Sequence, residues 1–311
     1  MRASTRWART VMMGVVRRAG TYSIVARDAD TLELGVAVQS HWFSVGSAVP
    51  WVRAGVGAVA MQSIPIPGGG PRALELLAGM GAHDALRMLV AGDEEHEVRQ
   101  FGLVDARGEA AAHTGAMCIA HAGDVSGPGY TCQANMMATP DVWAAMAAGY
   151  ESAAGSLAER LVQALEAGEA AGGDVRGRQS AAVVVVPPEG EAHARSVDLR
   201  VEDHPDPVRE LWRLLVLHRA YEIAGTADEL VAQGRHAEAA EHFERAAEIA
   251  PDNDELLFWA GLAAVQQGRR EAGLERVRRA MEANPAWGEL LPRLPAELVP
   301  SAPAVREALG L

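Results

Sequence analysis

The sequence predicts an α+β sandwich over residues 21–202, followed by an all-α domain over residues 206–311. In the first region, strand patterns and helix patterns come in runs, with pairs of helices between groups of strands. Runs of this kind favour separate sheets covered by helix pairs over alternating β-α-β units. Beyond Pro205 the composition changes to Ala, Glu, Arg and Leu. With 311 residues and 49% apolar side chains, the chain is long enough to bury two cores.

The elements of the first region follow from alternation, apolar spacing and turn residues. Residues 32–39 place apolar side chains at alternate positions, which predicts a strand that pairs with the strand before it across a turn at 28–31. Leu157, Leu161 and Leu165 lie four residues apart, as on one face of a helix. The predicted strands are 22–26, 32–39, 55–61, 99–105, 110–114, 127–137, 180–186 and 196–201, and the predicted helices are 72–80, 83–90, 140–150 and 156–168.

An internal repeat of 34 residues marks the second region. The spacing looks like the tetratricopeptide helix-turn-helix pattern, in which small residues let paired helices approach and a proline follows the second helix. We expect helices over 210–223 and 302–309 to cap the stack, because two repeats alone leave apolar faces uncovered. Stacked helix pairs present a groove, which favours a protein partner; packing on the sandwich, or on another copy in a homo-oligomer, is the alternative. The repeated pairs are Gly234 and Gly268, Ala246 and Ala280, and Pro251 and Pro285.

The charge and the types of basic residue exclude several functions. A formal net charge of −13 argues against a nucleic-acid partner and against an anionic membrane surface. All 28 basic residues are arginine, which excludes a Schiff-base lysine, a phosphate-loop lysine and a Ser-Lys dyad. No residue cluster has the spacing of a zinc site, so we expect neither a metal nor a cofactor. The two cysteines, Cys118 and Cys132, indicate no disulfide framework and fit a reducing cytoplasm.

Residues 1–20 form a separate segment with five arginines and no acidic residue. The apolar stretch at 11–16 is too short for the core of a signal peptide. No stretch of the chain reaches the roughly 20 apolar residues that a membrane span needs. We expect this segment to be a disordered extension, a propeptide, or the result of a start codon placed too far upstream.

Thr21 opens the first convincing strand and follows Gly20. If Thr21 were the first residue of the mature chain, its hydroxyl would be a nucleophile and its own α-amine the general base, with an ordinary pKa of about 7.7–8.0. Ser23 lies on the same face of the strand under the two-residue alternation, and it could assist or be the nucleophile instead. The alternative is that Thr21 is simply an early strand residue.

Four polar patches follow apolar strands, at positions where functional sites tend to lie. Gln133 and Asn135 share one face of a strand, and Asp174 follows two glycines. Arg176 and Arg178 could bind an anionic group or form a solvated charged face. Each patch also has a purely structural interpretation, as a polar strand edge or a turn. The residues are Gln39, Ser40 and His41; Gln62 and Ser63; Gln133 and Asn135; and Asp174, Arg178, Gln179 and Ser180.

An ordered series of motifs lies at residues 21–28, 35–41, 45–47, 55–60, 170–174 and 177–182. Together they resemble one bacterial family, domain of unknown function 1028, which is placed in the Ntn (N-terminal nucleophile) hydrolase superfamily. The resemblance covers about residues 21–200. It implies the four-layer αββα Ntn-hydrolase sandwich shared with proteasome β subunits and related amidohydrolases, and it implies hydrolysis of an amide bond without pointing to a substrate.

For that activity we expect Thr21 to attack the carbonyl of a small amide or peptide. A backbone N–H near Ser63 and the side chain of Asn135 would hold the oxyanion, and Asp174 and Ser180 would orient the amine. Substrate binding is assigned to Gln39, Ser40, His41, Arg53, Gln62, Gln133, Arg178 and Gln179.

The absence of lysine and two departures from the family pattern favour a second interpretation. Proteasome-type sites use a lysine beside the threonine, so Arg53 or Arg27 would have to supply positive charge here. Ala134 stands in a Gln-Ala-Asn sequence where the family usually shows Gln-Gly-Asn, and residues 64–71 lack the usual Asn-Pro and Tyr-Gly. These features fit a catalytically inactive ligand-binding or scaffold protein whose helical repeats recruit a protein partner.

Overall fold

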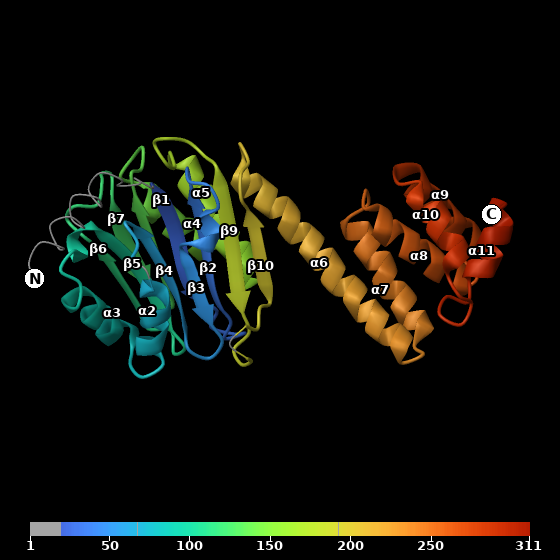
Figure 1. Cartoon of the computed structure of the whole chain (residues 1–311), viewed down its shortest axis with the longest axis horizontal. Helices are drawn as coiled ribbons and strands as arrows, with labels where there is room; N and C mark the ends of the chain where they lie inside the picture. The colour runs from blue at the N-terminus through green and yellow to red at the C-terminus, as the bar shows by residue number, and fades with distance from the viewer. Residues whose placement is uncertain (1–19, 67, 192) are drawn as a thin grey trace, which may run out of the picture. The chain divides into compact units, whose positions relative to one another are not determined.

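The chain divides into two units, the first ending at Trp212 and the second beginning at Arg213. The structure is a computed structural model and describes residues 20–66, 68–191 and 193–311. The first unit carries two antiparallel sheets with helices, and the second is built of helices (Figure 1). The prediction of a mixed α and β region with antiparallel sheets, followed by a helical region, is confirmed.

The strand β1 (Thr21–Arg27) lies inside the larger sheet of the first unit. It pairs with β2 on one side and β8 on the other, so Thr21 is opposite both Ser40 and Asn135. In spatial order the sheet consists of β10 (Val197–Val201), β9 (Ser180–Val186), β2 (Leu34–Ser40), β1, β8 (Tyr130–Asn135) and β7 (Gly123–Gly127).

A four-stranded sheet faces the larger one. Val25 and Val38 from the larger sheet share one buried core with Ala60 and Val104 from the smaller. Because side chains alternate along a strand, Thr21 and Ser23 point to the same side as Val25, toward the smaller sheet. The smaller sheet runs β3 (Pro50–Arg53), β4 (Gly57–Ser63), β5 (Arg99–Asp105) and β6 (Ala110–Thr114).

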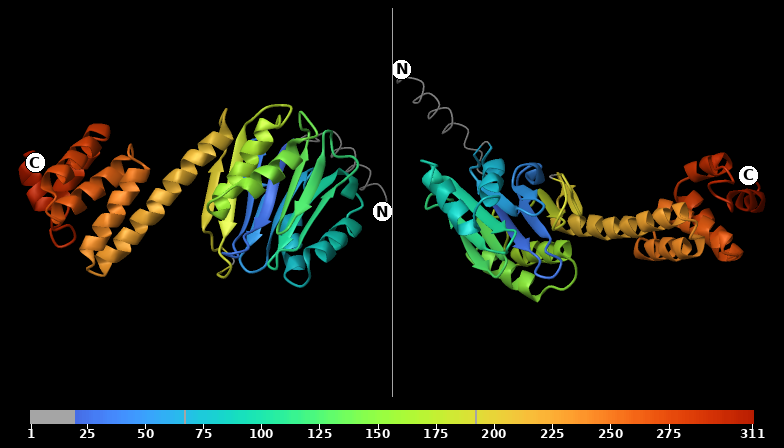
Figure 2. Two further views of the ribbon diagram at one scale, coloured as in Figure 1. Left: turned by 180° about the vertical axis from the view of Figure 1, so that it is seen from behind. Right: turned by 90° about the horizontal axis from the view of Figure 1, so that it is seen from below.

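Two helix pairs cover the outer faces of the two sheets (Figure 2). Helices α2 (Gly69–Leu77) and α3 (Ala82–Ala91) pack on the smaller sheet, and α4 (Val142–Ser152) and α5 (Leu157–Ala170) pack on the larger. At the start of α5, Ser156 and Glu159 form a reciprocal capping box, which satisfies two backbone N–H groups.

Three elements differ from the prediction, and the first of them, β3, was not predicted at all. The strand expected over 127–137 is a hairpin of β7 and β8, because Gly129 turns the chain with φ of 76°. The helix expected to end at 223 continues as α6 (Pro207–Ala232). Its later residues Ala224, Ala227 and Leu230 are buried in one core with residues of the next helix, and this packing carries the helix onward.

The helical unit keeps the 34-residue period. Gly234 and Gly268 follow the ends of helices with φ of 74° and 79°, and a Cβ added at either position would meet no other atom within 4 Å. Backbone conformation alone therefore favours glycine there. Ala246 and Ala280 are fully buried between helices. The helices after α6 are α7 (His236–Ile249), α8 (Asp254–Gln266), α9 (Arg270–Ala283), α10 (Ala286–Leu290) and α11 (Ala302–Leu309).

An ion-pair cluster links α7 to the start and middle of α9. Glu244 accepts hydrogen bonds from Arg269 and, at 2.6 Å, from Arg276. These two arginines lower the pKa of Glu244 below its ordinary value of 4.5. A carboxyl whose pKa is lower in the folded chain stabilises that chain above the unfolded pKa, and the effect is lost as pH falls through the folded value.

We expect Glu244→Gln to lower the free energy of unfolding of the helical unit by about 0.5–1 kcal/mol at neutral pH. The difference from the wild type should shrink as the pH falls from 4.5 through the lower pKa of the folded chain, since the wild-type carboxyl becomes protonated over that range. Urea denaturation followed by helical circular dichroism, at neutral and acid pH, measures both. The control is Glu241→Gln on the exposed side of the same helix. An equal loss at both pH values would contradict the ion-pair account.

Candidate functional site at Thr21

The hydroxyl of Thr21 is buried next to the peptide bond that precedes it. Thr21 is only 1% exposed, and its Oγ1 donates a hydrogen bond to the Ser40 hydroxyl at 3.1 Å. The Ser40 hydroxyl in turn donates to the carbonyl oxygen of Gly20. A nucleophile-type hydroxyl and a backbone carbonyl therefore belong to one hydrogen-bonded chain.

A guanidinium group also holds the carbonyl of Gly20. The Nη2 atom of Arg176 lies 2.8 Å from that oxygen and 2.7 Å from a carboxylate oxygen of Asp174. The Asp174 side chain is fully buried, and it also accepts the backbone N–H groups of His41 and Arg176. Asp174 thus fixes the arginine, and the arginine places positive charge on the Gly20 carbonyl.

The turn that carries this arginine occurs twice in the chain. Residues 105–108 and 174–177 both read Asp-x-Arg-Gly, and in both the aspartate accepts the N–H of the arginine two residues later. Arg107 is 74% exposed and its guanidinium bonds Asp105, whereas Arg176 is 23% exposed and also bonds Gly20. The Asp-x-Arg-Gly pattern indicates the turn from the sequence alone, but it does not indicate that Arg176 bonds the Gly20 carbonyl.

Below Thr21, buried amide side chains connect the two sheets. Ser23 donates to Oε1 of Gln62 at 2.6 Å and accepts from Nε2 of Gln133 at 2.6 Å. Gln62 donates to the carbonyl oxygen of Thr21 at 3.2 Å and to Oε1 of Gln100 at 2.8 Å. Because Ser23 and Gln133 lie on the larger sheet and Gln62 and Gln100 on the smaller, this network ties the sheets together at one end.

Gln100 completes the network and was not predicted as a site residue. Its amide nitrogen donates to the carbonyl of Ala134 and to the hydroxyl of Thr114. Its Oε1 accepts from Nδ2 of Asn135 at 2.9 Å. Gln100 is fully buried as the second residue of β5. Its amide at the start of a strand that continues with mostly apolar residues is the only sequence signal that could have indicated it.

Unusual backbone conformations gather at the same end of the sheets. Ser44, Ser63 and Met136 have φ of 58°, 67° and 59°, although none is glycine. Ser63 ends β4, Met136 follows β8, and Ser44 lies four residues beyond the end of β2. Such conformations cost free energy and occur often at functional sites. Three of the four in the described chain lie at the Thr21 end of the sheets, with Leu32 the exception.

The helix side of the larger sheet holds a second buried polar group. The Tyr22 hydroxyl donates to Glu169 of α5 at 2.6 Å, and burial together with Glu169 raises the pKa of Tyr22. Arg178 binds the same carboxylate at 2.5 Å, and this bond raises the pKa of the arginine. Gln39 pairs with Tyr22 in register and is fully buried; neither polar atom of its amide has a hydrogen-bond partner among the described residues.

The structure brings together some of the predicted site residues and separates others. Arg53 pairs with Gly57 at the far end of β4 and donates to the Leu74 carbonyl, and Arg27 lies at the far end of β1. Neither brings charge to Thr21, where Arg176 does so instead. Gathered around Thr21 are Ser23, Ser40, Gln62, Gln133, Asn135 and Asp174.

Other predicted residues have structural partners nearby. Ser180 accepts the N–H of Val45 and donates to the carbonyl of Trp42, which fixes the loop after β2. His41 is exposed, and its Nδ1 lies 3.2 Å from the carbonyl oxygen of Arg178. Gln179 donates to Asp203.

Neither a membrane helix nor a metal cluster is found in the described part of the chain. No helix there is long and apolar enough to cross a bilayer. Within residues 20–66, 68–191 and 193–311, no group of three or more His, Cys, Asp or Glu side chains is arranged to hold a metal ion. Cys118 and Cys132 are both free, and burial raises the pKa of each thiol.

The fold and the site define a two-part protein, in which an α+β unit with a buried hydroxyl and amide cluster precedes tetratricopeptide-like helices. A tetratricopeptide repeat model matches residues 230–291, as the 34-residue period predicts. The model of a family of unknown function, DUF1028, matches residues 21–211, and the chain belongs to that family.

One solved structure extends this comparison. The chain is similar to protein SPO2555 from Silicibacter pomeroyi, a DUF1028 protein, with 30% sequence identity and a TM-score of 0.58. The match covers 63% of this chain and 88% of that one. No curated protein matches the chain. The resemblance drawn from the sequence motifs is therefore confirmed at the level of the family.

We expect Gln62→Met to lower the free energy of unfolding by about 2 kcal/mol, since it leaves Ser23 and Gln100 buried with fewer partners. Methionine keeps most of the side-chain volume, so lost hydrogen bonds account for the change. Urea denaturation followed by the sheet signal in circular dichroism measures it. Gln163→Met, at an exposed position of α5, is the matched control. Equal stability of the two variants would show that the network contributes nothing.

Proposed function

We propose that this protein is an amidohydrolase of the N-terminal-nucleophile type, with Thr21 as the nucleophile and its own α-amine as the general base. The observation that carries the proposal is the hydrogen-bonded chain from the Thr21 hydroxyl through Ser40 to the Gly20 carbonyl, with Arg176 on the same oxygen. The two facing sheets covered by helix pairs are the layers expected of an Ntn hydrolase. The free cysteines fit a cytoplasmic location.

The first reaction of the site would be on its own chain, because the nitrogen of Thr21 is still in a peptide bond with Gly20. The Thr21 oxygen adds to the Gly20 carbonyl carbon, while its proton passes to the Ser40 hydroxyl and the Ser40 proton passes to the Gly20 oxygen. As the C–N bond breaks, a proton moves from that oxygen to the nitrogen, and Gly20 becomes an ester on the threonine oxygen. Water hydrolyses this ester, which releases the Gly20 carboxylate and leaves a free Thr21 amine.

Turnover of a substrate then repeats these steps with the free amine as base. The amine takes the proton of the Thr21 hydroxyl as its oxygen attacks the amide carbonyl, and it later gives a proton to the leaving nitrogen. Once Gly20 has gone, Arg176 and Ser40 can donate to the oxyanion in its place. Losing one such donor typically costs about 3–4 kcal/mol. Water and the same amine then release the acyl group from the threonine.

This assignment changes the predicted roles of three residues. The amide of Asn135 donates to Gln100 at 2.9 Å and approaches the Thr21 carbonyl at 3.5 Å, so we assign it to the supporting network rather than to the oxyanion. Asp174 acts through Arg176, which it holds in place. We place Ser180 behind the loop after β2, away from the amine. The chemistry requires no cofactor.

We expect the full chain to convert to a product that begins at Thr21, and intact-mass spectrometry of the purified protein follows the conversion. Thr21→Ala should block it, since the attacking oxygen is gone. Arg176→Gln should slow it by about 100-fold through loss of a donor to the Gly20 carbonyl.

The matched control is Arg107→Gln, which removes an arginine from the same Asp-x-Arg-Gly turn elsewhere in the fold. It should convert at the wild-type rate. Cleavage at the same bond in Thr21→Ala, or an unchanged rate in Arg176→Gln, would rule out the proposed chemistry.

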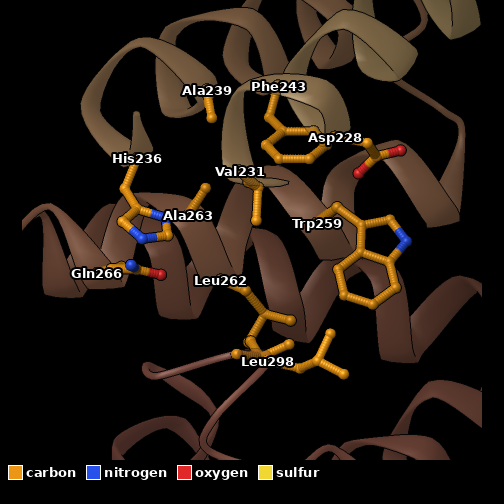
Figure 3. A pocket seen from close by; sticks show the side chains of 11 residues that line it. Asp228, Val231, His236, Ala239, Phe243, Trp259, Leu262, Ala263, Gln266 and Leu298 are labelled. Carbon is orange, nitrogen blue, oxygen red and sulfur yellow. The ribbon is translucent and has the colours of Figure 1, made fainter. Parts of the chain in front are cut away.

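A second candidate function is protein binding by the helical unit. A cavity of about 210 Å³ lies between α6, α7 and α8, with apolar walls that include Phe243, Trp259 and Leu262 (Figure 3). Asp228 stands at this cavity; burial raises its pKa, and the neighbouring Glu255 raises it further. A cation would relieve both effects, so the cavity favours a peptide with an apolar side chain next to a basic one.

Calorimetric titration of the full chain with two short synthetic peptides tests this candidate. One has a central leucine between arginines, and the other has the same leucine between glutamates. We expect binding of the first only, weakened about tenfold by Asp228→Asn, while Glu241→Gln leaves it unchanged. Equal binding of both peptides, or of neither, would count against a basic apolar ligand.

A further inference from the structure

The α-carbon of Gly20 has no room for a side chain. A Cβ atom built there lies 2.7 and 2.9 Å from the carboxylate oxygens of Asp174, and 2.9 Å from Nη2 of Arg176. Cβ atoms of side chains essentially never approach other atoms within 3.0 Å. Any residue larger than glycine at this position must therefore displace the carboxylate or the guanidinium.

The wall formed by these two side chains is held firmly. The Asp174 carboxylate is fully buried and accepts the N–H groups of His41 at 3.2 Å and Arg176 at 2.9 Å. Its ion pair with Arg176 is also mostly shielded from water, since that guanidinium is 23% exposed. Moving the carboxylate away would take the acceptor from these partly buried donors and break the ion pair with Arg176, which is costly.

Around this wall, three loops expose large apolar side chains. Phe43, Met117, Ile119 and Val175 are 63%, 66%, 42% and 62% exposed, and they are four of the six large exposed apolar residues described in the first unit. We call these four residues the apolar collar. Loops with exposed apolar groups next to a site are typical of binding surfaces.

Backbone hydrogen bonds join the collar to the Thr21 site. The N–H of Met136, next to Asn135, binds the carbonyl of Ile119, and the carbonyl of Met136 accepts from Val175. On the other side, His41 bonds Asp174 and precedes Phe43 by two residues. The three loops therefore meet at the end of the sheet where Gly20 lies.

Charged side chains on the same loops are already engaged. Arg176 is paired with Asp174, Arg178 with Glu169, and Glu97 accepts the backbone N–H of Ala116 at 2.7 Å. The collar thus offers a ligand mainly apolar surface.

This inference rests on the proposed function, in which Gly20 is the first acyl group to be transferred to the Thr21 oxygen. The acyl part of a substrate later occupies the same place. We infer that the site hydrolyses amides whose acyl α-carbon carries no side chain and whose acyl tail is apolar. Two kinds of compound share this chemistry: peptides with an apolar residue before a glycyl amide, and amides of unbranched fatty acids.

Four aminomethylcoumarin amides test the restriction on the form that begins at Thr21. They are acetyl-phenylalanyl-glycyl, acetyl-phenylalanyl-alanyl, octanoyl and 2-methyloctanoyl amides. We expect kcat/KM to be about 10–100-fold higher for each unsubstituted member than for its methylated partner. Comparison of kcat/KM for the glycyl and octanoyl amides tells whether the site prefers a peptide or a fatty-acid amide. Equal rates within each pair would overturn the inference.

Variants of the collar test the apolar tail. Phe43→Ser and Val175→Ser should each lower kcat/KM for the preferred long substrate by about tenfold. The matched controls are Leu32→Ser and Met88→Ser, which each remove one of the two large exposed apolar residues described in the first unit outside the collar. If all four variants behave alike, the collar does not bind the tail.

A stability measurement separates this inference from the proposed function. In a Thr21→Ala chain, which cannot convert, Gly20→Ala should lower the urea midpoint, whereas Gly79→Ala should not, because a Cβ at Gly79 meets only the Leu76 carbonyl at 3.8 Å. If the protein hydrolyses none of the four amides, the proposed hydrolase activity is wrong. The urea midpoints still measure whether the wall excludes a side chain at residue 20. Equal midpoints for the Gly20→Ala and Gly79→Ala chains would show that Asp174 and Arg176 move aside for a Cβ atom. The inferred restriction on the substrate would then be wrong, even if the enzyme is active.

Discussion

The position of Thr21 depends on a buried polar network between two sheets. Ser23, Gln62 and Gln100 exchange hydrogen bonds where a sandwich of this kind would otherwise have apolar contacts. A buried network is favourable only when its members are satisfied, so its geometry tolerates little shift of one sheet against the other. The apolar core formed by Val25, Val38 and Val104 supplies the general attraction between the sheets, and the amides set their alignment at the Thr21 end.

An arginine, Arg176, supplies the positive charge at this site, because the chain contains no lysine. Arg176 is half-buried beside the fully buried Asp174 and reaches the Gly20 carbonyl, so its charge is directed by a fixed carboxylate. A guanidinium keeps its proton at any working pH, and its planar donors can hold a carboxylate and a carbonyl at once. It cannot carry protons, which leaves that task to hydroxyls and to an amine.

Local pattern predicted much of the fold and less of the site. The 34-residue period located Gly234 and Gly268, because a turn with positive φ needs no distant partner. Strand alternation put Thr21 and Ser23 on one face, and the hydrogen bond from Ser23 to Gln62 of the facing sheet agrees with this. The hydrogen bonds of Gln100 and the contact between Arg176 and Gly20 join segments far apart in the sequence, so no local pattern predicts them. The length of α6 was missed for the same reason, since tertiary burial of Ala227 and Leu230 carries it past residue 223.

The anchoring of Tyr22 has a consequence for the lifetime of the protein. Its hydroxyl binds Glu169 at 2.6 Å, and its backbone lies between two neighbouring strands. Chain ends are ordinarily the loosest part of a fold and the first to be trimmed. A chain end created at Thr21 would instead be held by hydrogen bonds inside a sheet. An aminopeptidase must bind several extended residues in its own cleft, and these residues would not be free to leave the sheet.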